Sequence, residues 1–503
     1  MSLLGIDIGS GSCKGVVFDY EGRMLAASSQ EYSTYSPAHN MVEIDAEVFW
    51  DSIVKVSRQV SGMVENNPIE ALSISSHGET FIPVYSDGNA AGPAVMNSDN
   101  RAVKQSQWWE STMGRERIYG VTGLPLHPMF ALNKIMWLKE NNPETYSKAD
   151  RFVSAGDCIL GKMGLPHYTD YSLASRTMAF DITKKEWSDE ILYAAGIGKD
   201  KLGIPLPSGE AAGRLSAESA TVLGLRTGTV VAMGGHDQPC GALGSGVIDA
   251  GEVSDSAGTY ECMTAVSEIP GNTGRALSYS LNSYCHVVPD RYVMLAFFPA
   301  GVVSRWFIEQ FCFEDKYQAE KLGKRIFEIL DRNMEKTVPG PTGLCITPHF
   351  VGSCNPHWDS RATGVMAGLT PQITRYHLYK AIYEGIACEL AINTKVLEEV
   401  TGKFDSIRIN GGNALSPFTV QLRADLTGKR IHTLNSNEAV CQGAAMLAGI
   451  AAGVYKDAAD AVRRVVKLDK TYLPDSVSMD EYKKQLRKYE LLYPSMAWLR
   501  DLD

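Results

Sequence analysis

The chain has 503 residues, of which 44% are hydrophobic and 21% charged, and its formal net charge is −10 at pH 7. That length exceeds one hydrophobic core and predicts two domains. The acidic balance argues against nucleic acid or an anionic membrane surface as the main partner. No apolar run is long enough to span a membrane, the N-terminus lacks signal-peptide regions, and the ten cysteines form no CxxC pair. We therefore expect a cytoplasmic two-domain protein.

The first predicted element is a hairpin at the N-terminus. "LLGIDI" (3–8) and "CKGVVF" (13–18) are predicted strands, joined by the turn "GSGS" (9–12). A small-residue turn with free backbone N–H groups can bind phosphate oxygens, Asp7 at the strand end can hold hydrated Mg²⁺, and Lys14 adds a positive charge. The alternative is an ordinary glycine-rich hairpin. The spacing is not a dinucleotide fingerprint, and no P-loop is present.

Further along, a helix is predicted over 45–65 with Asp45 as its N-cap, and a mainly helical insertion over 100–225. Residues 229–246, "TVVAMGGHDQPCGALGSG", predict a strand, a glycine turn and a helix that begins near Gln238. Asp237 would then lie beside a helix N-terminus, a position that suits a general base. A helix-capping aspartate is the equally good alternative.

A second hairpin is predicted in the other half. "GEVSDSAGTYECMTAV" (251–266) repeats the design of a strand with an aspartate (Asp255), a "SAGT" turn and a second strand, which predicts a duplicated domain. Helices are predicted over 374–402 and 436–453, and a terminal helix from about 470. Between strand and helix at 407–428, the Gly411-Gly412 turn would let an adenine ring lie against backbone, or is a plain loop.

The ordered motifs "DIGSGS", "SDNR", "GGHDQ", "SAGT", "NPHWDSRATGVMAGLT", "LYKAIYEGIA" and "GGNALSP" resemble the FGGY family of carbohydrate kinases. Residues 364–384, "GVMAGLTPQITRYHLYKAIYE", match that family's C-terminal signature, and the resemblance covers about residues 3–450. It implies an α/β fold of two ribonuclease-H-like, actin-like domains, over 1–247 and 248–503, with ATP and sugar meeting between them. A homodimer is also expected from the family.

The resemblance assigns roles to individual residues. Asp237 would be the catalytic base, and Asp7 would organise Mg²⁺ through water. The expected ATP-binding residues are Ser10, Gly11, Ser12 and Lys14 in the first loop, Gly258 and Thr259 in the second, and Gly411, Gly412 and Asn413 at the adenosine. Phosphoryl transfer asks mainly for positioning and charge neutralisation, which fits this set of residues.

For the sugar, the resemblance points to His77, Gly78, Glu79, Asp99, Arg101, His236 and Gln238. The motifs are most similar to those of xylulokinases, although Gly78-Glu79-Thr80 and His236-Asp237-Gln238 depart from the xylulokinase pattern. The His236-Asp237 pair and "SAGTYE" (256–261) resemble kinases of fuculose and rhamnulose instead. We therefore expect a kinase that converts D-xylulose to D-xylulose 5-phosphate. The alternatives are a kinase of L-fuculose or a related deoxyketose, a glycerol or polyol kinase, and, in a different class, an actin-like regulatory ATPase without a sugar acceptor.

Overall fold

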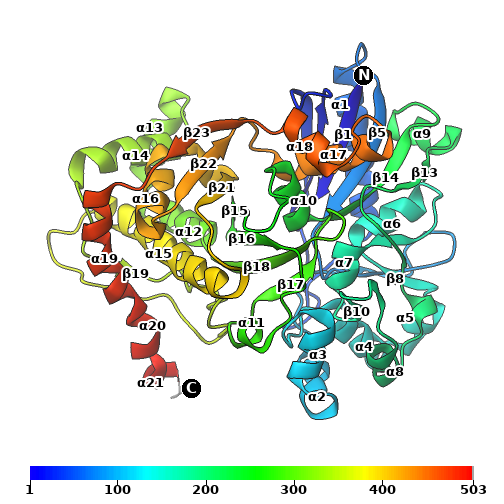
Figure 1. Ribbon diagram of the computed structural model, residues 1–503, viewed down its shortest axis with the longest axis horizontal. Helices are drawn as coiled ribbons and strands as arrows, with labels where there is room; N and C mark the ends of the chain where they lie inside the picture. Colours follow the sequence, from blue (N-terminus) through cyan, green and yellow to red (C-terminus); the bar gives the residue numbers. More distant parts are fainter. Residues whose placement is uncertain (501–503) are drawn as a thin grey trace.

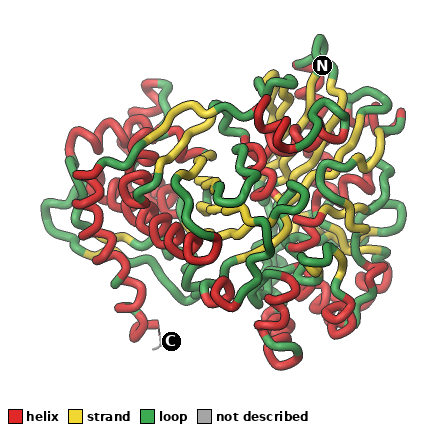
Figure 2. The backbone as a smooth tube through the Cα atoms, in the orientation of Figure 1, coloured by secondary structure: helices red, strands yellow, loops and turns green. Residues whose placement is uncertain are grey.

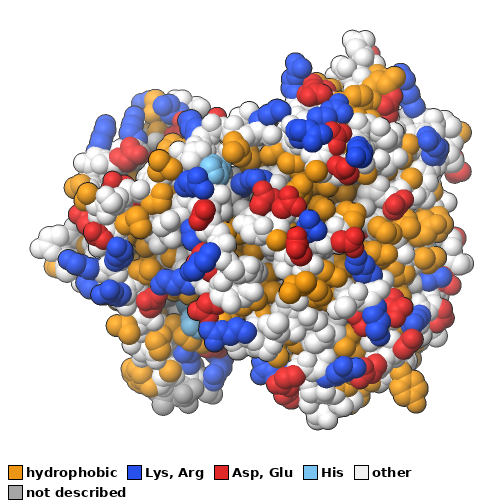
Figure 3. All heavy atoms as spheres, viewed as in Figure 1, with side chains coloured by type: hydrophobic (Ala, Val, Ile, Leu, Met, Phe, Trp, Pro, Cys, Tyr) orange, Lys and Arg blue, Asp and Glu red, His pale blue; other side chains and the backbone are white. Residues whose placement is uncertain are grey.

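The computed structural model describes residues 1–500 and consists of two lobes, each built around one β-sheet with helices packed on it (Figure 1). The first lobe contains the N-terminal half of the chain, and the second contains most of the C-terminal half. This mixed α/β architecture confirms the predicted fold class. No helix among residues 1–500 is both long and apolar enough to cross a membrane. On the face viewed in Figure 3, basic and acidic side chains are interspersed.

The first sheet has the strand order β13-β14-β5-β1-β2-β3. Strands β1 and β2 form the predicted antiparallel hairpin, and β5 and β14 extend the sheet in parallel from β1. The strands are β1 (Ser2–Ile8), β2 (Ser12–Phe18), β3 (Met24–Glu31), β5 (Ile69–Ser76), β13 (Ala211–Arg214) and β14 (Val230–His236). In this register Asp7 lies directly opposite Lys14.

The second sheet has the order β17-β18-β16-β15-β21-β22-β23. Its strands are β15 (Val253–Ala257), β16 (Tyr260–Ser267), β17 (Asn282–Cys285), β18 (Tyr292–Pro299), β21 (Ser406–Asn410), β22 (Arg430–Leu434) and β23 (Leu468–Tyr472). The run β18-β16-β15-β21-β22 has the same sequence of antiparallel and parallel pairings as β3-β2-β1-β5-β14. The predicted duplication is therefore present at the level of topology.

The insertion predicted over 100–225 is mainly helical, as expected. It contains α2 (Val103–Thr112), α3 (Arg115–Thr122), α4 (Ala131–Asn141), α5 (Pro143–Lys148), α6 (Ala155–Lys162), α7 (Tyr171–Ser175), α8 (Asp189–Ala195) and α9 (Ala217–Leu223). Short strand pairs accompany them: β6 (Ile82–Val84) with β8 (Arg151–Val153), β9 (Tyr168–Asp170) with β12 (Ile204–Leu206), and β10 (Phe180–Asp181) with β11 (Glu186–Trp187). Its aromatic core includes the buried Trp109, Phe130 and Phe180.

The helices of the second lobe surround α15 (Arg375–Thr401), which is followed by Gly402 with φ +90°. One helix of the C-terminal half, α18 (Ala458–Val465), packs instead on the first lobe, where Ala461 and Val465 share a core cluster with Leu3 and Phe18. The other helices of the second lobe are α11 (Gly274–Ser278), α12 (Gly301–Phe311), α13 (Phe313–Leu322), α14 (Ile326–Thr337), α16 (Pro417–Thr427), α19 (Ser476–Glu490), α20 (Leu492–Ser495) and α21 (Ala497–Arg500). Figure 2 shows these helices around the second sheet. A terminal helix from about 470 was the expectation, but residues 468–472 form edge strand β23 and the helix starts at Ser476. This part of the prediction is wrong, because pairing with β22 decides the conformation of that segment.

Two helices join the lobes: α10 (Asp237–Gly244) and α17 (Ala439–Ala451). Although α17 belongs to the C-terminal half of the sequence, it packs on the first sheet with the core residues of β1 and α10. Glycines permit this approach: a Cβ on Gly5 would lie 1.8 Å from the Cys441 carbonyl oxygen, and one on Gly443 would lie 1.9 Å from that of Cys240. Backbone therefore packs directly on backbone at the junction. The domain boundary at 247/248 stays a prediction.

Two local predictions need correction. The Gly234-Gly235 pair lies within β14 and not in a turn. Glycine is needed at position 234 because a Cβ there would lie 1.8 Å from the Ile74 carbonyl oxygen of the neighbouring strand. The helix after β14 accordingly begins at Asp237 itself. Helix α1 (Glu47–Met63) has Ala46 at its N-cap position, while the Asp45 carboxylate accepts a hydrogen bond from the Glu47 amide at 3.1 Å.

Candidate active site

The β1–β2 turn presents backbone amides at the end of the first sheet. Gly9 N–H donates to the Ser12 carbonyl at 2.9 Å, while Tyr32 donates from its amide to the Gly11 carbonyl and from its hydroxyl to the Gly9 carbonyl. The carbonyls are thus held by the protein. Within the described chain the amides of Ser10 and Gly11 have no acceptor, and both residues are exposed. Such a turn is suited to binding phosphate oxygens.

The β15–β16 turn has the same organisation. The amides of Ala300 and Val302 both donate to the Thr259 carbonyl at 3.2 Å, and Gly301 N–H donates to the Gly258 carbonyl at 3.1 Å. The start of α12 thereby holds the carbonyls, much as Tyr32 does in the first turn. The amide of Thr259 has no acceptor among residues 1–500.

The third loop, Gly411 to Asn413, lies against this second turn. Gly411 has φ +89°, and a Cβ there would lie 2.8 Å from the Ala257 carbonyl oxygen, so only glycine fits. Gly412 and Asn413 line a cavity of about 240 Å³ whose walls also include Phe327, Tyr379 and Ser416. Gly412 and Asn413, two of the three predicted adenosine residues, therefore border a cavity that has aromatic as well as polar walls.

Lys14 and Asp7 lie side by side near the first turn. The Lys14 ammonium group forms an ion pair with Glu438, with Nζ 2.9 Å from Oε2, which ties β2 to the residue before α17. Burial raises the pKa of the Asp7 carboxyl to about 7, although the Lys14 charge and Ser75 oppose that rise. The Glu438 contact was not predicted, because the two residues are 424 positions apart.

Asp237 is the first residue of α10, where the lobes meet. Its side chain is 24% exposed, and its Oδ1 lies 3.1 Å from the Nε2 of His236. Burial, together with the charges of Asp7 and Glu79, raises the pKa of Asp237 to about 8, while the Gln238 amide and Arg176 lower it. The Asp237 charge also contributes to the raised pKa of Cys262 on β16. Asp237 is therefore within electrostatic reach of both sheets.

The donor set near Asp7 and Asp237 suits a divalent cation. In the described part of the chain, Oδ1 of each carboxylate is buried and accepts no hydrogen bond. The charge of Asp7 also raises the pKa of Asp237, as a like charge does. A hard dication that prefers oxygen ligands would give the buried Oδ1 atoms a partner and would offset the repulsion between the two carboxylates. These residues fit Mg²⁺ held directly or through water.

The predicted sugar residues fall into two groups. Gly78 and Glu79 adjoin Asp237: a Cβ on Gly78 would lie 2.9 Å from the His236 ring, and Gln238 follows in the first turn of α10. His236 Nδ1 in turn lies 3.2 Å from the hydroxyl oxygen of Tyr284. These residues lie beside the Asp237 carboxylate and are referred to below as the wall.

The remaining three are engaged within the chain. Both ring nitrogens of His77 have partners, Nδ1 with the Ile8 carbonyl at 2.9 Å and Nε2 with the Thr80 hydroxyl at 2.7 Å. Asp99 is fully buried, and its oxygens accept from Arg101 and from the Val42 amide. Arg101 also pairs with Glu43. The hydrogen-bonding groups of these three residues therefore already have partners within the chain.

Sequence reasoning missed three residues of this wall: Arg176, Asn282 and Tyr284. Arg176 pairs with Glu79, and Asn282 and Tyr284 come from β17 of the second lobe. The one available signal was a charged residue in the otherwise neutral stretch "SLASRTMAF". Nothing local in the sequence indicated the two residues of β17.

Two sheets of one topology, with paired hairpin turns and a carboxylate between them, define the actin-like ATPase fold. The chain belongs to the FGGY family of carbohydrate kinases: the model of the family's N-terminal domain matches residues 2–244, and that of its C-terminal domain matches residues 254–452. It is therefore an ATP-dependent sugar kinase.

Relatives with two different names align over almost the whole chain. It is 27% identical over 502 residues to a xylulose kinase of Escherichia coli, with 98% of this chain and 100% of that one covered. It is 26% identical over 484 residues to a gluconokinase of Bacillus subtilis, with 96% and 93% covered. The ligand-bound xylulose kinase structure from Lactobacillus acidophilus superposes with a TM-score of 0.88 at 24% identity, covering 99% of this chain and 98% of that one. This last likeness establishes the fold alone.

Proposed function

We propose that the protein transfers the γ-phosphoryl group of ATP to a hydroxyl of a small ketose, D-xylulose first, giving D-xylulose 5-phosphate. The proposal rests on Asp237, a partly exposed carboxylate with a raised pKa at the junction of the lobes, in contact with the predicted sugar wall. L-Fuculose or a related deoxyketose is the second candidate acceptor, because His236-Asp237-Gln238 departs from the xylulokinase pattern.

In the proposed mechanism, ionised Asp237 accepts the proton of the attacking sugar hydroxyl. As that oxygen bonds to the γ-phosphorus, the bond from the γ-phosphorus to the bridging β–γ oxygen breaks and ADP leaves. The turn amides of Ser10, Gly11 and Thr259 would hold phosphate oxygens by hydrogen bonds, and Lys14 would add positive charge. When bound, Mg²⁺ supplies further neutralisation of the phosphate charge, with Asp7 as its proposed ligand, directly or through water.

An ADP-release assay across D-xylulose, L-fuculose, glycerol and other ketoses tests the proposal, and ³¹P NMR of the product locates the phosphate. We expect sugar-dependent ADP release that Asp237→Asn reduces by about 10²- to 10⁴-fold, with ATP binding retained. Asp51→Asn, on the exposed side of α1, is the matched control and should leave turnover unchanged. Full sugar-dependent turnover in Asp237→Asn would remove the assigned base. ADP release that no sugar stimulates would favour the regulatory-ATPase alternative.

A further inference from the structure

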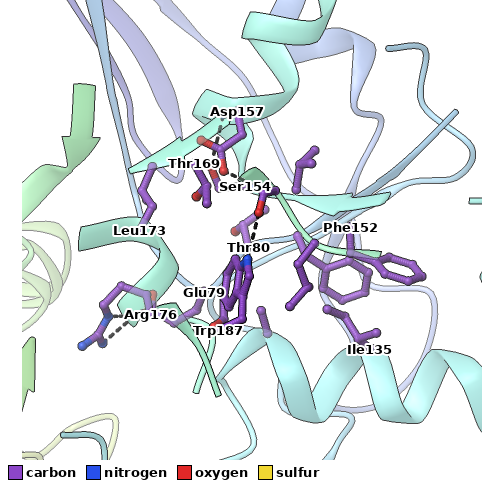
Figure 4. Close-up of a pocket in the computed structure, with 16 residues that line it drawn as sticks. Glu79, Thr80, Ile135, Phe152, Ser154, Asp157, Thr169, Leu173, Arg176 and Trp187 are labelled. Atoms are coloured by element: carbon purple, nitrogen blue, oxygen red, sulfur yellow. Dashed lines mark hydrogen bonds and ion pairs between the residues drawn. The ribbon is translucent and has the colours of Figure 1, made fainter. Parts of the chain in front are cut away.

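The wall beside Asp237 contains a buried ion pair that no motif predicted. Arg176 follows α7 and places Nε 2.6 Å and Nη2 2.5 Å from the Oε1 atom of Glu79 (Figure 4). The Arg176 and Glu79 side chains are only 3% and 6% exposed. Gly78 makes room for the pair, since a Cβ there would lie 2.9 Å from the Arg176 side chain. The pair is therefore a fixed part of the wall.

The Arg176 guanidinium is held on several sides. Nη1 donates to the side-chain oxygen of Asn282 at 3.0 Å, which links the first lobe to β17 of the second. The rings of Tyr284 and Phe130 lie 4.8 Å and 5.4 Å from the guanidinium carbon. The positive charge is thus neutralised by Glu79 and packed between aromatic rings, so it is not a free cation for an incoming carboxylate.

Glu79, by contrast, keeps an acceptor available. In the described chain all of its side-chain contacts with Arg176 involve Oε1, and no donor reaches Oε2. Its charge is among those that raise the pKa of Asp237. The charges of Asp7 and Glu79 both act on Asp237, and the positive charge of Arg176 beside them is already paired with Glu79. A ligand hydroxyl can donate to such a wall, whereas a ligand carboxylate meets like charge.

We propose that the Arg176–Glu79 pair makes this kinase selective for neutral sugars: Glu79 accepts a hydrogen bond from a substrate hydroxyl, and sugar acids such as gluconate are excluded. The inference rests on the proposed function, in that a sugar is phosphorylated beside Asp237. It adds a prediction of which substrate class is used, a neutral sugar such as xylulose or a sugar acid such as gluconate, after which the relatives are named. Arg176 acts as a positioning residue that holds the Glu79 carboxylate in place.

The test compares kcat/KM for D-xylulose, L-fuculose, glycerol and D-gluconate in the wild-type enzyme and in Glu79→Gln. We expect gluconate to fall about 100-fold below the best neutral substrate, because like-charge contacts cost several kcal/mol. Glu79→Gln removes the repulsion and releases part of Arg176, so the ratio of gluconate to neutral turnover should rise about tenfold or more. Glu190→Gln, which breaks the exposed Arg117–Glu190 pair, is the matched control and should leave the ratio unchanged.

The outcomes separate this inference from the proposed function. If the wild-type enzyme phosphorylates gluconate as well as any neutral sugar, and Asp237→Asn abolishes that activity, the selectivity is refuted while the kinase assignment stands. An unchanged ratio in folded Glu79→Gln would also refute it. The wild-type comparison of gluconate with neutral sugars needs no variant, so it still tests the inference if Glu79→Gln misfolds. If no sugar of either class is phosphorylated, the proposed function falls, and the inference falls with it.

Discussion

Lys134 of α4 offers a test of the electrostatics behind the sugar wall. Its side chain is fully buried, and its Nζ donates to the Met96 carbonyl at 2.8 Å. Burial lowers the pKa of this ammonium group from 10.5 to about 7, while the charges of Asp99 and Glu79 oppose the shift and that of Arg101 adds to it. We predict that Lys134→Met stabilises the protein at neutral pH and removes a pH dependence of its stability.

The magnitude follows from the two pKa values. The lowering from 10.5 to about 7 corresponds to about 5 kcal/mol of unfavourable free energy when the group is charged in both states, which holds below about pH 7. Between the folded and the unfolded pKa, only the unfolded chain binds the proton, so stability rises with pH by about 1.4 kcal/mol per unit. The advantage of Lys134→Met should therefore shrink by about 3 kcal/mol from pH 7 to pH 9.

Chemical denaturation followed by tryptophan fluorescence measures this difference. Trp109 is a suitable reporter, because it is buried and its indole N–H donates to Asn133 beside Lys134. Lys104→Met, at an exposed lysine of α2, is the control and should show no such pH dependence. A stability difference between Lys134→Met and wild type that stays constant from pH 7 to pH 9 would refute the reasoning, since the lysine would then keep its proton on folding.

Three further predictions concern the site and the junction of the lobes. Because the pKa of Asp237 is raised to about 8 and the base must be ionised, kcat/KM should rise with pH through that value, and saturating Mg²⁺ should move the rise to lower pH; a flat pH profile would contradict this. Lys14→Met should raise the KM for ATP about tenfold without changing that for the sugar, and steady-state kinetics showing the reverse pattern would count against Lys14 as a phosphate ligand. Gly443→Ala should lower stability by about 1–3 kcal/mol, because its Cβ would meet the Cys240 carbonyl oxygen. In Gly62→Ala, where nothing lies within 4 Å, stability should rise by up to about 1 kcal/mol; equal melting temperatures for the two variants would disprove the backbone contact.

The elements that the sequence predicted well are those specified by local pattern. Both hairpins, 2–18 and 253–267, have alternating or apolar strands around a turn of small residues, and both formed as expected. Helices α15 and α17 begin and end within a few residues of the predicted 374–402 and 436–453. Two of the errors, at Gly234-Gly235 and at β23, arise where a neighbouring strand overrides the local preference. Pairing between strands that are distant in sequence cannot be read from the pattern of about ten neighbouring residues.

The sugar wall was less predictable, because a polar side chain that could bind a ligand can instead be buried and hydrogen-bonded within the protein. His77, Asp99 and Arg101 are the residue types that bind hydroxyls, and their motif placed them at the sugar. In the fold a buried charge is tolerated only with partners, and these three residues take theirs from the Ile8 carbonyl, the Val42 amide and Glu43. Composition alone does not distinguish a ligand-facing carboxylate from one that is satisfied internally.

Gly78 is a sequence feature that indicates the nearby arginine, although the sequence alone does not say which residue lies there. A glycine next to a predicted sugar ligand indicates that a backbone or a long side chain must pass close by. The side chain that passes is that of Arg176, which is 97 positions from Glu79 and is anchored to Asn282 a further 106 positions along. The three residues therefore depend on one another: Gly78 leaves room for the Arg176 side chain, and Arg176 pairs with Glu79. We expect substrate class to follow all three together, so that substituting Gly78 alone would displace Arg176 before it could add a new sugar contact.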